Sequence, residues 1–151
     1  MHRLESTVAV REASTQWQGD LQTGSGVVSL DSSKAAQFPV TFPVRTGEPE
    51  GHTSPEELLA AAHSACFAMS LSNALAQAET PVTTLSVNAA VELGRNDTGL
   101  AITSIRLTVE GTVPGITAEA FTAAAESAKT GCIVSRALAG VSDISVSATL
   151  L

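Results

Sequence analysis

A long apolar segment between Thr53 and Leu75 most constrains how this chain can fold. It opens with a helix-start signal: Ser54 suits the N-cap, Pro55 the first helical position, and Glu57 closes a capping box. After this first turn the segment is apolar nearly all round, and its many alanines let neighbouring elements approach closely. A helix without a polar face is typical of a buried position, so we expect a central helix covered by the rest of the chain.

The composition limits the class of protein. The chain has 151 residues, of which 44% are hydrophobic, and this predicts one globular domain over residues 1–151. The net charge of −7 argues against nucleic acid or an anionic membrane as a partner, because either needs a basic face. We expect no apolar run that spans a bilayer, and the N-terminus lacks a signal-peptide pattern. The sequence therefore predicts a cytoplasmic protein.

Strand patterns surround the central helix. Before it, residues 7–17 and 27–30 are rich in β-formers, and residues 38–44 alternate but contain two prolines, which is typical of an edge strand.

After it, apolar residues occupy every second position in 85–93 and 105–113, which predicts an antiparallel hairpin. A second helix follows from Thr117 to about Lys129 and ends at Gly131, a short helix covers 132–138, and a last strand covers 141–150. The order β-β-β-α-β-β-α-β predicts an α+β fold in which antiparallel sheet covers a buried helix.

The chain has two cysteines, Cys66 in the apolar helix and Cys132 near the start of a later helix, and four interpretations of them stay open. Both can be small core residues. A structural disulfide is disfavoured in a reducing compartment. A metal site has only His2, His52 and His63 as further ligands, so we predict none. In a redox cycle, one thiol is oxidised to a sulfenic acid and the other resolves it.

The redox interpretation needs a cation near Cys66. A thiol in an apolar helix has a raised pKa and is inert unless positive charge lies close to it. The helix start cannot supply that charge, because Cys66 lies about three turns further on. Arg45 in the preceding loop is the candidate cation, and Glu56 is the carboxylate that would hold it. The alternative is a solvated loop charge and an acid that complements the helix dipole.

Two motifs carry a resemblance to a known family. They are Pro55-Glu-Glu-Leu-Leu-Ala-Ala-Ala-His-Ser-Ala-Cys-Phe67 and Gly131-Cys-Ile-Val-Ser-Arg-Ala-Leu138. With the arginine in the loop before the helix, the chain resembles the OsmC/Ohr family, the osmotically inducible and organic-hydroperoxide-resistance proteins. The His-Ser-Ala-Cys-Phe version is closer to the OsmC branch.

The resemblance implies a thiol-dependent peroxidase that reduces organic hydroperoxides to alcohols on an intertwined homodimer, with active sites at the subunit interface. By position, Cys66 is then the peroxidatic cysteine, Cys132 the resolving cysteine, Glu56 the catalytic glutamate and Arg45 the loop arginine. No bound cofactor is implied, and the reductant is an external dithiol of lipoyl type.

Two further expectations concern the pocket and one departure from the family. Phe67 is expected in an apolar substrate pocket, and His63 either joins it or is a hydrogen-bonded core histidine. The family usually has Cys-Pro-Val-Ser, and Ile133 here replaces a proline that would stiffen the short helix. Its loss is expected to loosen Cys132 and to alter disulfide formation. The alternatives from other classes are a peroxide-inactive stress or binding protein and a thiol redox sensor on the same fold.

Overall fold

The computed structural model of this protein describes residues 6–151, so the candidate ligand His2 lies outside the described residues. The chain divides into two compact units, one ending at Ser54 and the other running from Pro55 to Leu151. Each unit has its own three-stranded sheet.

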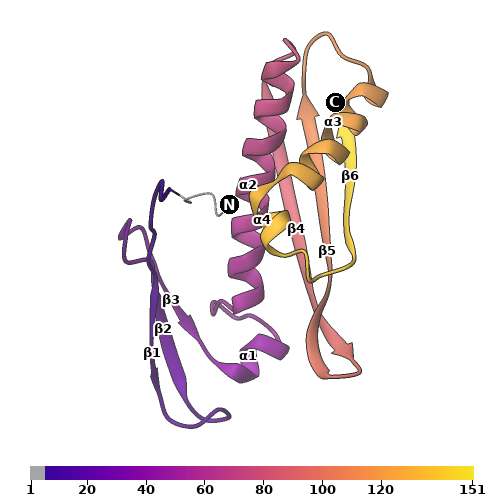
Figure 1. Cartoon of the computed structure of the whole chain (residues 1–151). Helices are drawn as coiled ribbons and strands as arrows, with labels where there is room; N and C mark the ends of the chain where they lie inside the picture. Colours follow the sequence, from indigo (N-terminus) through magenta and orange to yellow (C-terminus); the bar gives the residue numbers. More distant parts are fainter. Residues whose placement is uncertain (1–5) are drawn as a thin grey trace, which may run out of the picture. The chain divides into compact units, whose positions relative to one another are not determined.

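The N-terminal unit is a small antiparallel sheet of β1 (Ser14–Gln18), β2 (Ser25–Ser29) and β3 (Gln37–Val40), in chain order (Figure 1). Pro39 lies in β3 at the edge of this sheet, as its lack of an N–H predicts. Every residue of β1 is exposed, and Trp17 and Val27 are 41% and 42% exposed. The strands of this sheet therefore bury few side chains.

The prediction of strand structure up to Val44 is wrong, because helix α1 (Phe42–Thr46) follows β3 directly. Thr41 is its N-cap and accepts a hydrogen bond from the Val44 N–H at 3.4 Å, and Pro43 stands in its first turn. These local signals outweigh the alternating pattern of apolar residues. The first strand is also shorter than predicted and begins at Ser14.

The C-terminal unit is built on α2 (Pro55–Gln77), which begins at the proline that the sequence predicts. Its buried positions recur one or two turns apart and form one face: Glu56, His63, Phe67, Leu71 and Leu75. The expectation of a helix buried on all sides is not met within this chain, because Met69 is 72% exposed. By length and mean hydropathy, α2 also passes for a membrane span, contrary to the sequence analysis. It packs against β4, α3 and α4.

The second sheet has the order β4 (Thr84–Asn96), β5 (Gly99–Thr112), β6 (Ile144–Leu150). The predicted hairpin β4–β5 is confirmed and is longer than expected. It closes on a tight turn in which Asn96 Oδ1 accepts from the Thr98 N–H at 2.9 Å. The expectation of a purely antiparallel sheet is wrong, because β6 pairs parallel with β5. A parallel neighbour requires a crossover connection, and α3 and α4 supply it.

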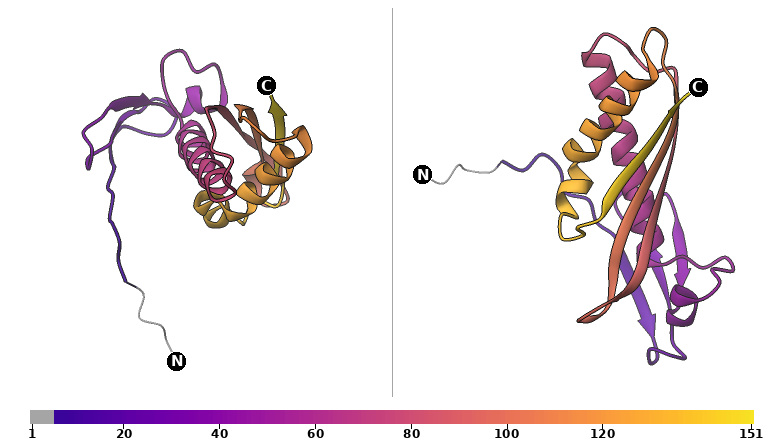
Figure 2. Two further views of the ribbon diagram at one scale, coloured as in Figure 1. Left: turned by 90° about the horizontal axis from the view of Figure 1, so that it is seen from above. Right: turned by 90° about the vertical axis from the view of Figure 1, so that its right-hand side faces the viewer.

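Helices α3 (Ala118–Gly131) and α4 (Ile133–Ala137) complete the fold. Helix α2 packs along β4 and α3 along β6, and the two helices contact each other, so both cover one face of the sheet (Figures 1 and 2). Residues of β5 alternate between this core and the opposite face as predicted. The core residues of the unit are Phe67, Leu71, Leu75, Leu107, Val109, Val113, Phe121, Ala125, Ala128 and Cys132.

Candidate active site

The two cysteines of the chain meet inside the C-terminal unit. Cys66 lies midway along α2, and Cys132 is both the C-cap of α3 and the N-cap of α4. The Cys132 N–H donates to the Ala128 carbonyl at 2.8 Å, and its own carbonyl accepts from the Arg136 N–H at 3.0 Å. These backbone bonds hold Cys132 between two helices. Its Sγ lies 3.0 Å from Cys66 Sγ, and both residues are thiols.

The two thiols differ in their access to solvent. Cys132 is completely buried, whereas Cys66 is partly exposed. A reagent from solvent therefore reaches Cys66 first. Exposed positions one turn before and after Cys66 on α2 are apolar, namely Ala62 and Met69.

The environment of each sulfur shifts its ionisation in the opposite direction. Burial, followed by the contact with Cys132, raises the pKa of the Cys66 thiol. Burial also opposes ionisation of Cys132, but the contact with the Cys66 sulfur and the polar groups of Ser135 and Val134 outweigh it and lower the Cys132 pKa. The paired sulfurs titrate as one unit, and the groups of this unit favour the negative charge on Cys132. Cys66 therefore needs a further positive group to become the thiolate, as the sequence analysis argues.

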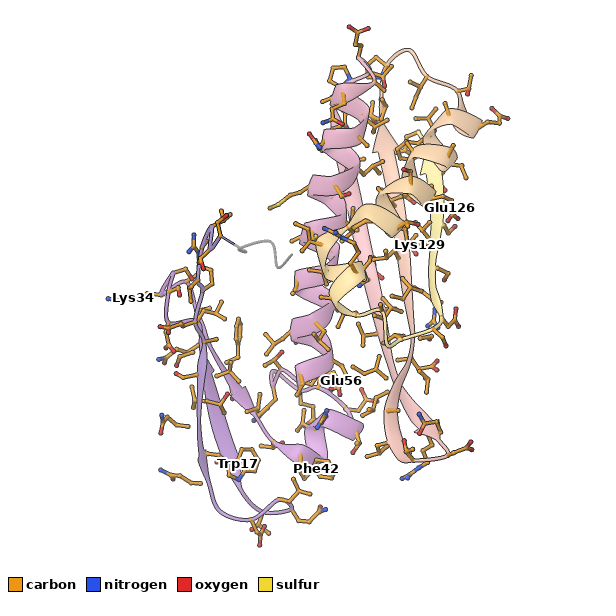
Figure 3. All side chains as sticks on the ribbon, viewed as in Figure 1. Trp17, Lys34, Phe42, Glu56, Glu126 and Lys129 are labelled. Atoms are coloured by element: carbon orange, nitrogen blue, oxygen red, sulfur yellow. The ribbon has the colours of Figure 1, made fainter. Side chains whose placement is uncertain are left out.

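The two charged candidates lie in different units. Arg45 is the basic residue in the last turn of α1, in the N-terminal unit. Glu56 lies in the first turn of α2 and is 7% exposed (Figure 3). Helix α2 is unbroken between Glu56 and Cys66, which places them about 15 Å apart along its axis. Glu56 and Cys66 of one chain therefore do not touch, and the roles of Arg45 and Glu56 stay predictions.

The predicted pocket residues His63 and Phe67 are both fully buried. His63 is a hydrogen-bonded core histidine, one of the two possibilities in the sequence analysis. Its Nε2 lies 2.7 Å from Ser135 Oγ. Ser135 stands within the second cysteine motif, but no role for it was predicted from the sequence. One sequence signal could have suggested this pair: His63 stands three residues before Cys66 and Ser135 three residues after Cys132, so each lies one helical turn from a cysteine.

Residues 6–151 contain no group of three or more His, Cys, Asp or Glu side chains placed to bind a metal ion.

Comparison with known proteins decides the family. Residues 47–147 match the family described as OsmC-like protein. This chain belongs to the OsmC family. It is 43% identical over 128 residues to the peroxiredoxin OsmC of Escherichia coli K12, covering 85% of this chain and 89% of that protein. Shigella flexneri has a peroxiredoxin OsmC with the same identity and coverage.

Solved structures of OsmC and Ohr proteins share the fold. An organic hydroperoxide resistance protein from Elizabethkingia anophelis is 26% identical to this chain, with a TM-score of 0.71. The match covers 97% of this chain and 98% of that protein's chain. An OsmC-like protein from Mycoplasma pneumoniae has a TM-score of 0.72 at 17% identity, over 96% and 99% of the two chains, which shows likeness of fold alone. The chain thus belongs to a family of peroxidase and stress proteins.

Ile133, where the OsmC family usually has proline, contributes through its backbone. Its side chain is 69% exposed, but its N–H and that of Val134 are hydrogen-bond donors to Cys66, and each favours the thiolate. Proline has no N–H to donate. Apart from this missing N–H, proline suits position 133, because Ile133 is the first residue of α4. Cys132 before it, with φ −58° and ψ 128°, already has the extended backbone that a residue before proline adopts.

We therefore expect Ile133→Pro to raise the Cys66 pKa and to slow its oxidation about threefold at neutral pH, since one weak hydrogen bond to the thiolate is lost. The same change should alter the free energy of unfolding by less than about 0.5 kcal/mol, because the gain from restricting the unfolded chain is offset by the lost hydrogen bond. The measurements are the pH dependence of thiol alkylation and the urea midpoint. Ile133→Ala keeps the N–H and is the control. Equal thiol reactivity in the proline and alanine variants would contradict the role of this donor.

Proposed function

We propose that this protein is a cysteine-based peroxidase that reduces organic hydroperoxides to alcohols through a Cys66 sulfenic acid and a Cys66–Cys132 disulfide. The supporting observation is the 3.0 Å between the two Sγ atoms, which residues 66 positions apart in sequence reach only through the packing of α2 against α4. A sulfenic acid formed on Cys66 has a resolving thiol in contact with it.

The reaction proceeds in three balanced steps. The Cys66 thiolate attacks the terminal oxygen of the hydroperoxide, the O–O bond breaks, and the alkoxide leaves as the alcohol after taking up a proton. The Cys132 thiolate then attacks Cys66 Sγ and displaces hydroxide, which is released as water. An external dithiol supplies two electrons by thiol–disulfide exchange, becomes a disulfide itself and restores both thiols.

Arg45 stabilises the Cys66 thiolate and the departing alkoxide in this mechanism. The raised pKa of Cys66 within the C-terminal unit supports the need for such a cation. Glu56 acts by holding the arginine, because its place on α2 keeps it away from Cys66 of the same chain.

The substrate class follows from the surface beside the reactive thiol. Ala62 and Met69 are exposed one turn away from Cys66, whereas the predicted pocket residue Phe67 is fully buried and presents no surface to a substrate. An alkyl group of an organic hydroperoxide gains free energy by covering such apolar surface, whereas hydrogen peroxide does not. We therefore place organic hydroperoxides before hydrogen peroxide as substrates.

A homodimer is the working form in this proposal. Helix α2, with Met69 72% exposed, and the N-terminal sheet, with Trp17 and Val27 41% and 42% exposed, each leave apolar surface that a second copy can cover. The family resemblance adds that the active sites lie at the subunit interface and that the reductant is a lipoyl-type dithiol. The cytoplasmic location predicted from the sequence is part of the same proposal.

The test is a single-turnover oxidation of the reduced protein with one equivalent of tert-butyl hydroperoxide, in which free thiols are counted over time. We expect both thiols of the parent protein to disappear within seconds and the single thiol of Cys66→Ser to survive. Adding dihydrolipoamide should then give many turnovers, whereas a redox sensor would consume about one equivalent. Survival of both thiols in excess peroxide for many minutes would leave a protein that shares only the fold.

A further inference from the structure

Two interactions join α2 to α4 at neighbouring turns. One is the contact between the sulfurs of Cys66 and Cys132. The other is the buried hydrogen bond between His63 Nε2 and Ser135 Oγ at 2.7 Å. Ser135 lies beside both, because it stands one turn after Cys132 in the short helix α4, and its presence there helps to lower the pKa of Cys132. Three buried side chains thus follow one another from His63 through Ser135 to Cys132.

Which group donates and which accepts between His63, Ser135 and Cys132 follows from the protons that each side chain carries. A Cys132 thiolate can only accept, so the single hydroxyl proton of Ser135 is donated to the sulfur. Ser135 Oγ then accepts from His63, which requires the proton of the neutral ring to sit on Nε2. Burial lowers the His63 pKa and so favours this neutral ring.

The other ring nitrogen supports the same assignment. Within residues 6–151, His63 Nδ1 is buried without a hydrogen-bond partner. With the proton on Nε2, Nδ1 presents only an unpaired acceptor. With the proton on Nδ1, a donor N–H would be buried unpaired and Ser135 would have to donate to His63 instead of to sulfur. Orphaned donors are rarer than under-satisfied acceptors, so the proton belongs on Nε2.

Solvent access decides which sulfur an external thiol can attack. Cys132 is completely buried and Cys66 is partly exposed, so a reductant reaches the Cys66 side of the disulfide. The new bond joins the reductant sulfur to Cys66, the Cys66–Cys132 bond breaks, and its electron pair goes to Cys132. A leaving thiolate that is better stabilised leaves faster.

We propose that Ser135, held in place by His63, stabilises Cys132 as the thiolate, both when Cys132 closes the disulfide and when it is expelled by an external dithiol that attacks Cys66. In this proposal Ser135 acts on the reacting sulfur itself, whereas His63 is a positioning residue that acts through Ser135. This proposal rests on the proposed function and adds to it the order of bond breaking in the reductive half of the cycle.

The test compares Ser135→Ala with Ser135→Thr, which keeps a hydroxyl. Ser70→Ala is the matched control for the position of Cys132, because Ser70 Oγ bonds at 3.4 Å the same Ala128 carbonyl that accepts from the Cys132 N–H, rather than the Cys132 sulfur. We expect Ser135→Ala to slow disulfide closure and reduction by dihydrolipoamide about tenfold each, the usual effect of losing a hydrogen bond to a charged group. Oxidation of Cys66 should change less than about twofold, and threonine should restore both slowed steps.

A second readout separates this proposal from the proposed function. In a Cys66→Ser background, the pKa of Cys132 is measured by thiolate absorbance and should rise by about one unit in Ser135→Ala. This measurement needs no peroxide and no dithiol, so it reports on Ser135 even if the parent protein proves inactive. His63→Gln, which keeps a donor N–H, should resemble the parent more than His63→Leu does.

Three results would overturn the role of Ser135. These are parent-like closure and reduction in Ser135→Ala, an unchanged Cys132 pKa in the Cys66→Ser background, or an equal loss in Ser70→Ala. Because His63 is fully buried, its variants also perturb the core, and the two serine variants therefore decide the outcome.

Discussion

Replacing Cys132 by serine is expected to lower sustained peroxide reduction by about a hundredfold or more, while the first oxidation of Cys66 stays as fast as in the parent protein. The chain has only two cysteines, so no other thiol can resolve the sulfenic acid. Burial and the contact with Cys132 together raise the Cys66 pKa, and serine removes the part that comes from the neighbouring sulfur. The first step therefore has no reason to slow.

The measurement is peroxide consumption in a stopped-flow instrument, followed by mass spectrometry of the product. In Cys132→Ser, Cys66 should be trapped as a sulfenic acid and pass to the sulfinic acid with more peroxide. The parent protein should form the intramolecular disulfide instead. Parent-like sustained turnover in Cys132→Ser would show that the 3.0 Å contact has no part in the cycle.

Truncating Phe121 to alanine is expected to lower the free energy of unfolding by about 3–5 kcal/mol, the usual cost of deleting a buried aromatic ring. Phe121 is completely buried in α3 and packs against the backbone of β5. A Cβ added to Gly111 would stand 2.8 Å from Phe121 Cζ, so the glycine makes room for the ring. Since α3 ends at Cys132, loss of this contact should also slow disulfide closure.

Urea unfolding should be followed by far-ultraviolet circular dichroism, because the single tryptophan, Trp17, lies in the N-terminal unit and does not report on α3. The protein concentration must be held constant, since a dimer gains stability with concentration. Thr122→Ala, an exposed change on the same helix, is the control and should shift stability by less than about 0.5 kcal/mol. A loss below about 1 kcal/mol in Phe121→Ala would contradict close packing of α3 on β5.

Local signals predicted much of this structure. The helix start at Pro55, the hairpin of β4 and β5 and the edge position of Pro39 each depend on residues within a turn or a strand of one another. The two cysteine motifs likewise predicted the OsmC family, which the comparisons confirm. Where two local signals competed, the weaker one misled: the alternation through Val44 suggested a strand, but the Thr41 cap formed α1.

Other features depend on elements that lie far apart in the chain. The parallel pairing of β6 with β5 follows from the crossover through α3 and α4, and no pattern within 141–150 distinguishes it from an antiparallel strand. The sequence by itself determined that a thiol stands in an apolar helix, that a second thiol begins another helix, and to which family the chain belongs. Only the tertiary structure decided that these thiols touch and that Ser135, one turn after the second of them, bonds His63. Side chains 66 and 72 positions apart meet through helix packing, which no local spacing encodes.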